Sequence, residues 1–215
     1  MSSTQMLTRR KDSAFTLVEL LVVIAIIVLM AALSVSAFKG GAGSDGTRGA
    51  SYLAATIFDA ARNEAIMRRV PTVVLFDVGT SSTLDTAYRR MTIAYNTNSN
   101  PDYTSGTGWI QSGKWMKFPA NAYFDSDRSR GVGMMTGVQF GATASSSCVV
   151  YEYLPNGQAN YSGVSPVMKV VFSPGMLSGG TFVERPDKKS LYGFVVNKLG
   201  HTQQFADLPS LMNCP

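Results

Sequence analysis

Few side chains in this 215-residue chain are of a type that could perform catalysis. The one histidine, His201, follows Gly200 in a predicted turn, where a lone histidine is usually exposed to solvent. No Cys/His cluster has the spacing of a zinc site, and no glycine-rich loop has the pattern that cradles a phosphate. We therefore expect a protein that is not an enzyme and that holds no cofactor.

The run Asp125-Ser126-Asp127 could offer oxygen ligands to calcium. A strong calcium site needs further acidic residues at spaced positions, and this run lacks them. A solvated turn is the better interpretation, so we predict no metal site.

The formal net charge of +5 raises the question of a nucleic-acid partner. Met1–Ala14 contribute +2, so a chain without them would carry +5 − 2 = +3. The C-terminal stretch from His201 onward contains neither Lys nor Arg. Because the electrostatic part of DNA affinity needs a dense basic patch, we do not expect DNA as a partner.

The two cysteines, Cys148 and Cys214, allow one disulfide if the domain is exported. Such a bridge would hold a C-terminal tail that otherwise frays. The alternative is two unpaired, buried thiols.

Glu19 is the one charged residue in the apolar block Phe15–Phe38. A helix of these 24 residues spans about 36 Å, enough to cross a hydrocarbon core of about 30 Å. The basic residues of Arg9–Lys11 precede it, which predicts a cytoplasmic N-terminus and an outward-facing remainder. A plain signal anchor would explain the block but not an acid within it, which costs about 2.5–3.5 kcal/mol at membrane depth.

The sequence Ala14-Phe15-Thr16-Leu17-Val18-Glu19 resembles the processing motif of type IV prepilins and type II secretion pseudopilins. The resemblance implies cleavage between Ala14 and Phe15, methylation of the new N-terminus, and assembly through Thr16, Leu17 and Glu19. Cleavage there would leave a cationic amine at Phe15, and because burial in lipid strengthens the attraction between opposite charges, we expect Glu19 to pair with the amine of a neighbouring subunit. The family usually has Gly where Ala14 stands, so we expect slower or altered processing.

The elements that follow divide the chain into four predicted parts. A leader (1–14) and a transmembrane and assembly helix (15–38) come first. A linker (39–49) with five glycines in eleven residues then opposes helix formation and predicts a flexible joint. A periplasmic pilin-like domain (50–215) completes the chain.

Within the domain, Ala50–Val70 has the apolar spacing of a second helix, which Pro71 ends. Short β-branched and aromatic runs separated by turn residues predict antiparallel sheets, so the fold class is α+β. Polar Asn96–Gly108 predicts an exposed loop, and turns are expected at 155–157 and 173–175. The predicted strands are Thr72–Val78, Tyr88–Tyr95, Trp109–Phe118, Val138–Phe140, Cys148–Leu154, Val167–Phe172 and Leu191–Val196.

Three segments of the domain carry a second resemblance. Ala60–Phe76, Tyr151–Ala159 and Tyr192–Gln203 are similar, in that order, to segments of the H-type (GspH/FimT-like) minor pseudopilins and minor pilins. The chain is longer than a typical H-type subunit, and we expect the extra length in Asn96–Arg130. Its size and pattern also resemble prepilin-type cassette proteins of verrucomicrobial bacteria.

These resemblances imply a minor pilin or pseudopilin of a type IV pilus-like or type II secretion-like assembly. Its expected partners are other pilins or pseudopilins, a prepilin peptidase and the inner membrane. The expected location is a single pass of that membrane, with possible extension into a pilus or pseudopilus. The alternative is a membrane-tethered binding module or adhesin that uses the helix only as an anchor; a membrane-bound hydrolase has no supporting set of residues.

Overall fold

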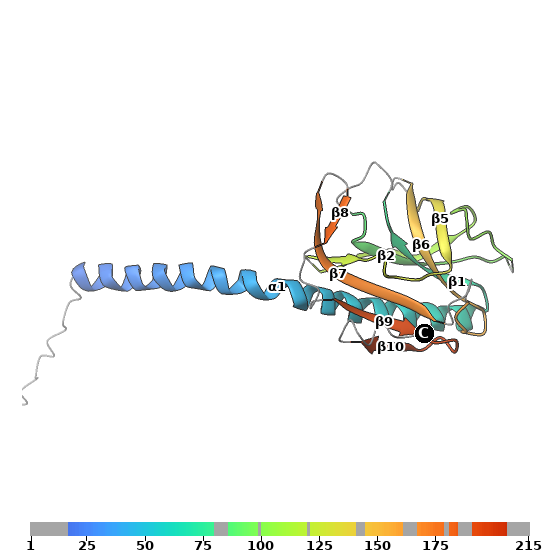
Figure 1. The fold of residues 1–215 in the computed structure, drawn as a ribbon, viewed down its shortest axis with the longest axis horizontal. Helices are drawn as coiled ribbons and strands as arrows, with labels where there is room; N and C mark the ends of the chain where they lie inside the picture. The colour runs from blue at the N-terminus through green and yellow to red at the C-terminus, as the bar shows by residue number, and fades with distance from the viewer. Residues whose placement is uncertain are drawn as a thin grey trace, which may run out of the picture. The chain divides into compact units, whose positions relative to one another are not determined.

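The computed structural model describes residues 17–79, 86–98, 100–119, 121–140, 145–160, 167–178, 181–184 and 191–205 (Figure 1). Within these ranges the side chains of 29–45, 176–178 and 181–184 lie outside the description. The chain divides into two compact units, Met1–Gly41 and Ala42–Pro215.

A single helix, α1 (Leu17–Arg68), runs through the glycine-rich segment 39–49. The backbone of the predicted linker is therefore helical, and its role as a flexible joint between anchor and domain stays a prediction. Each glycine costs about 1 kcal/mol relative to Ala, but helix on both sides removes the cost of a new nucleus. The boundary between the two units still falls within this segment. The helix ends where Arg69 takes a left-handed φ of 56° ahead of Pro71.

The first sheet has the strand order β3-β2-β1-β6-β5, and every neighbouring pair is antiparallel. β1 lies at its centre, and all six of its residues are buried. The strands are β1 (Thr72–Asp77), β2 (Arg90–Tyr95), β3 (Ile110–Lys117), β5 (Gly133–Val138) and β6 (Ser146–Tyr153).

The second sheet has the order β10-β9-β7-β4, and β8 pairs with β7 beyond this path. These pairs are also antiparallel, which confirms the predicted α+β class. The strands are β4 (Ala122–Phe124), β7 (Met168–Ser178), β8 (Thr181–Glu184), β9 (Tyr192–Val196) and β10 (Thr202–Phe205).

Phe58 of α1 lies at the centre of the main core. Its ring centroid is 5.0 Å from that of Phe194 in the second sheet and 5.2 Å from that of Tyr151 in the first. The helix therefore shares one apolar core with strands of both sheets. Because side chains alternate along a strand, Val73 and Leu75 point to the other face of β1, where they join a second buried cluster.

Most predicted strands are confirmed within a few residues, and two local predictions are wrong. The run Val138–Phe140 is not a strand, because β5 ends at Val138. The expected turn at 173–175 lies inside β7. Pro174 is tolerated there because pairing with β9 stops at Phe172, so no ladder hydrogen bond from its missing N–H is needed on that side.

Candidate functional site

The first described turns of α1 carry apolar side chains on all sides. Each of the twelve residues from Leu17 to Val28 is exposed, from Leu17 at 80% to Val23 at 46% among the large apolar ones. A helix that is apolar all round is typical of one that other helices or lipid cover. In the part of the chain that the structure describes, no helix has a stretch both long and apolar enough to cross a bilayer.

Glu19 lies in the first described turn of α1, and its side chain is exposed. A carboxylate at this end of a helix interacts favourably with the helix dipole. Leu17 is the first described residue, whereas Ala14, Phe15 and Thr16 lie outside the described residues. Cleavage after Ala14 and methylation of Phe15 therefore stay predictions.

Cys148 lies on β6, with its side chain fully buried against β1. Burial raises the pKa of this thiol well above its ordinary value, and the neighbouring Asp77 adds to the rise. Cys214 lies outside the described residues, so the Cys148–Cys214 bridge stays a prediction.

The three segments that carry the second resemblance meet at one point of the fold. Arg62 of α1 donates from Nε to the carbonyl oxygen of Gly157 at 3.1 Å and to that of Leu199 at 3.2 Å. Gly157 belongs to the turn after β6, as predicted, and Leu199 to the turn between β9 and β10. The order of the motifs was visible in the sequence, but the contact that joins them was not.

Two residues after Arg62, Glu64 connects α1 to β3 at the edge of the first sheet. Its Oε1 accepts a hydrogen bond from Ser112 Oγ of β3 at 2.7 Å and from Arg68 Nε at 2.7 Å. The Arg68 guanidinium also lies over the Tyr95 ring of β2, 4.3 Å from its centroid. The helical segment that resembles the H-type subunits thus binds both sheets through polar side chains.

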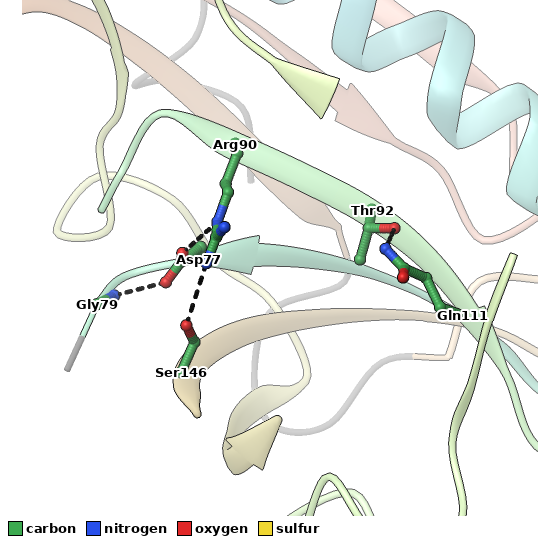
Figure 2. Close-up of polar contacts among 6 residues, drawn as sticks. All are labelled: Asp77, Gly79, Arg90, Thr92, Gln111 and Ser146. Atoms are coloured by element: carbon green, nitrogen blue, oxygen red, sulfur yellow. Dashed lines mark hydrogen bonds and ion pairs between the residues drawn. The ribbon is translucent and has the colours of Figure 1, made fainter. Parts of the chain in front are cut away.

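A buried ion pair joins the ends of three strands of the first sheet (Figure 2). Arg90 Nε of β2 donates to Asp77 Oδ2 of β1 at 2.6 Å, and Arg90 Nη2 donates to Ser146 Oγ of β6 at 3.3 Å. The other carboxylate oxygen of Asp77 accepts from the backbone N–H of Gly79 at 2.8 Å. The Arg90 guanidinium covers the Trp115 ring of β3 at 4.4 Å, so four strands meet around one charge.

The predicted exposed loop Asn96–Gly108 is in part packed on the first sheet. The Tyr103 hydroxyl donates a hydrogen bond to the buried carboxylate of Glu152, which also accepts a hydrogen bond from Asn160 Nδ2 at 2.5 Å. Trp109, just after the loop, is buried and donates from Nε1 to Asp102 O at 3.1 Å. Burial raises the pKa of Glu152, and the two donated hydrogen bonds oppose that rise. Aromatic residues within a polar run were the sequence signal for this packing.

The side chains considered for chemistry have other roles in the structure. The Asp125 carboxylate accepts from the backbone N–H of Arg128 at 3.0 Å and forms an ion pair with its guanidinium. His201 is exposed beside the β9–β10 turn. Among the described residues, no three His, Cys, Asp or Glu side chains gather in a way that could hold a metal ion.

Comparison with known proteins finds a described sequence motif at the N-terminus. Residues 9–35 match the family described as the prokaryotic N-terminal methylation motif. No curated protein sequence matches the chain. Among solved structures, the minor pseudopilin EpsH from the type 2 secretion system of Vibrio cholerae is similar, with a TM-score of 0.43 and 14% identity over 75% of this chain and 97% of that chain. At that score the likeness carries no functional assignment. The matched methylation motif includes the first apolar turns of α1 and Glu19, so the comparison places a prokaryotic N-terminal methylation motif on this helix.

Proposed function

We propose that this protein is a minor pilin or pseudopilin, a structural subunit of a type IV pilus-like or type II secretion-like assembly. The observation that carries the proposal is a helix whose exposed side chains from Leu17 to Val28 are apolar except for Glu19, inside a matched methylation motif. In this proposal residues 1–14 are the leader, 15–38 insert in the inner membrane as a single pass, and the domain from residue 50 lies outside the cytoplasm.

The proposed assembly reaction follows from the physics of the apolar environment. Cleavage before Phe15 would leave a cationic amine at the start of an apolar helix. Two opposite charges attract more strongly in a poor solvent than in water, so Glu19 of one subunit would pair with the amine of its neighbour. The apolar flanks would supply packing without specificity, and this charge pair would set the axial register between subunits.

Glu19→Val tests the proposed role, with Leu20→Val as a matched control in the same turn. The protein is expressed with the other prepilin-type subunits of its own genome, and each chain is scored for membrane extraction, N-terminal processing and co-purification. We expect Glu19→Val to be inserted and cut but to lose co-purification, while Leu20→Val keeps all three. Normal co-purification of a cut Glu19→Val chain would contradict the pairing. A chain that is never cut would favour the alternative of a tethered binding module or adhesin.

A further inference from the structure

The segment from Asn197 to Phe205 holds to α1 by polar contacts. Ser51 Oγ of the helix donates to Gln204 Oε1 at 2.8 Å, and Gln204 Nε2 donates back to the Ser51 carbonyl at 3.3 Å. Thr202 Oγ1 lies 3.4 Å from Asp59 Oδ1. Together with the Arg62 bond to Leu199 O, these contacts follow the helix over three turns.

The same segment contributes little to the apolar core. β9 ends in the main core at Val196, which is fully buried, but the next three residues are exposed. β10 is a four-residue edge strand paired with β9, and its residues are exposed or half-buried. Its apolar anchor is Phe205, which packs on Val171 and Leu191 in a small cluster outside the main core.

The turn between β9 and β10 packs against the guanidinium group of Arg62. Gly200 adopts a φ of +83°, and a Cβ built there would lie 2.3 Å from Gly157 O and 2.8 Å from Arg62 Nε. Only glycine therefore lets the two turns close on the guanidinium. A hydrogen bond from a charged donor is stronger than one between neutral groups, so the Arg62 bond should outweigh either bond between Ser51 and Gln204. At 3.2 Å it is also shorter than the other charged contact, from Thr202 to Asp59 at 3.4 Å.

We propose that residues 197–205 form a latch on α1 that opens as a unit while the rest of the domain stays folded, with Arg62 as the residue that keeps it closed. The edge position, the polar contacts and the abrupt end of the core at Val196 together separate this segment energetically from the sheets. An open latch leaves β9 as the new edge of its sheet. The latch is a property of the domain and does not depend on the proposed assembly function.

Hydrogen exchange of the full chain in detergent micelles, followed by mass spectrometry across a series of sub-denaturing urea concentrations, tests the latch. Local opening exposes little surface, so amides of 197–205 are expected to exchange at a rate that does not depend on urea. Amides of β1 (73–76) are expected to exchange by global unfolding, with a steep dependence on urea. If 197–205 show the same urea dependence as β1 in the unmutated protein, the proposal is overturned, whether or not any variant folds.

Arg62→Ala then tests the assigned residue, with Asn63→Ala as the control on an exposed neighbouring position. We expect Arg62→Ala to speed exchange of 197–205 at least tenfold and to leave β1 unchanged at low urea. Arg62→Lys keeps the charge but not the Nε geometry, so its exchange rate for 197–205 should lie between those of the wild type and Arg62→Ala. Equal acceleration of both regions would show that Arg62 stabilises the whole domain and is not a latch.

Discussion

Arg90→Met provides a sharp test of the reasoning about burial, because the chain contains a matched control. Arg90 and Arg68 each bind a carboxylate, at 2.6 Å and 2.7 Å, and each cover an aromatic ring, at 4.4 Å and 4.3 Å. They differ in burial: the side chains of the Arg90–Asp77 pair are 10% and 0% exposed, and those of the Arg68–Glu64 pair 48% and 15%.

The burial difference sets the expected magnitudes. Arg90→Met leaves the Asp77 carboxylate buried without its cationic partner, still accepting from the Gly79 N–H, which costs about 3–5 kcal/mol in unfolding free energy. Arg68→Met removes an exposed pair, which costs about 1 kcal/mol or less. At about 2–4 °C per kcal/mol for a chain of this size, Arg90→Met should lower Tm by roughly 6–20 °C.

Urea unfolding followed by circular dichroism measures both variants, with the double variant Asp77→Leu/Arg90→Met as a third arm. The double variant should recover part of the loss, because it no longer leaves a charge without its partner. Equal losses for Arg90→Met and Arg68→Met, or a loss below about 1 kcal/mol for Arg90→Met, would refute the argument from burial.

Three further predictions concern the domain. The Cys148 thiol, whose pKa burial raises, should resist alkylation at neutral pH in the native protein and react after unfolding; rapid native labelling would contradict its burial. Burial raises the pKa of Glu152 in the folded state. At a pH between the ordinary pKa and the raised one, the folded protein therefore binds more protons than the unfolded chain, and the contribution of Glu152 to stability falls as the pH rises through that window. Thermal melts of wild type and Glu152→Gln should therefore show the wild type losing stability relative to the variant on going up in pH, and a constant difference would exclude the effect. Gly200→Ala should lower the opening free energy of 197–205 by about 1–3 kcal/mol, seen as faster hydrogen exchange of that segment with β1 unchanged. Gly113→Ala, where φ is also positive but a Cβ meets nothing within 4 Å, should leave the exchange of 197–205 as it is, and an equal effect of both would contradict the reasoning.

The sequence predicted the parts of the fold that follow from local pattern. The β-branched run at 72–77 and the apolar spacing after residue 50 identified the central strand and the helix that packs on it. The continuous helix through 39–49 could not be predicted from glycine propensity, because that cost is small beside a helix already formed on both sides. β4 and β8 were missed because three or four residues give no clear period, and the strand conformation of both depends on pairing with β7.

Some residues of the candidate site could likewise be identified from local sequence pattern, and others could not. Glu19 was identifiable because a single acid in an apolar block is unusual at any position. Arg62 was not identifiable, because an arginine on the polar side of an amphipathic helix is normally expected to be solvated. Its role follows only from the two turns whose carbonyl oxygens it binds. The same holds for Glu152, whose partners Tyr103 and Asn160 come from separate loops.

The central claim is that the chain is cut after Ala14 and works with a modified Phe15 at its N-terminus. Intact mass combined with N-terminal sequencing of the membrane-extracted protein, made in a host with its own prepilin peptidase, tests it most directly. We predict a mature chain that begins with N-methyl-Phe15 and carries Glu19 as its fifth residue. A chain that keeps Met1 and has an unmodified leader would contradict the prepilin account.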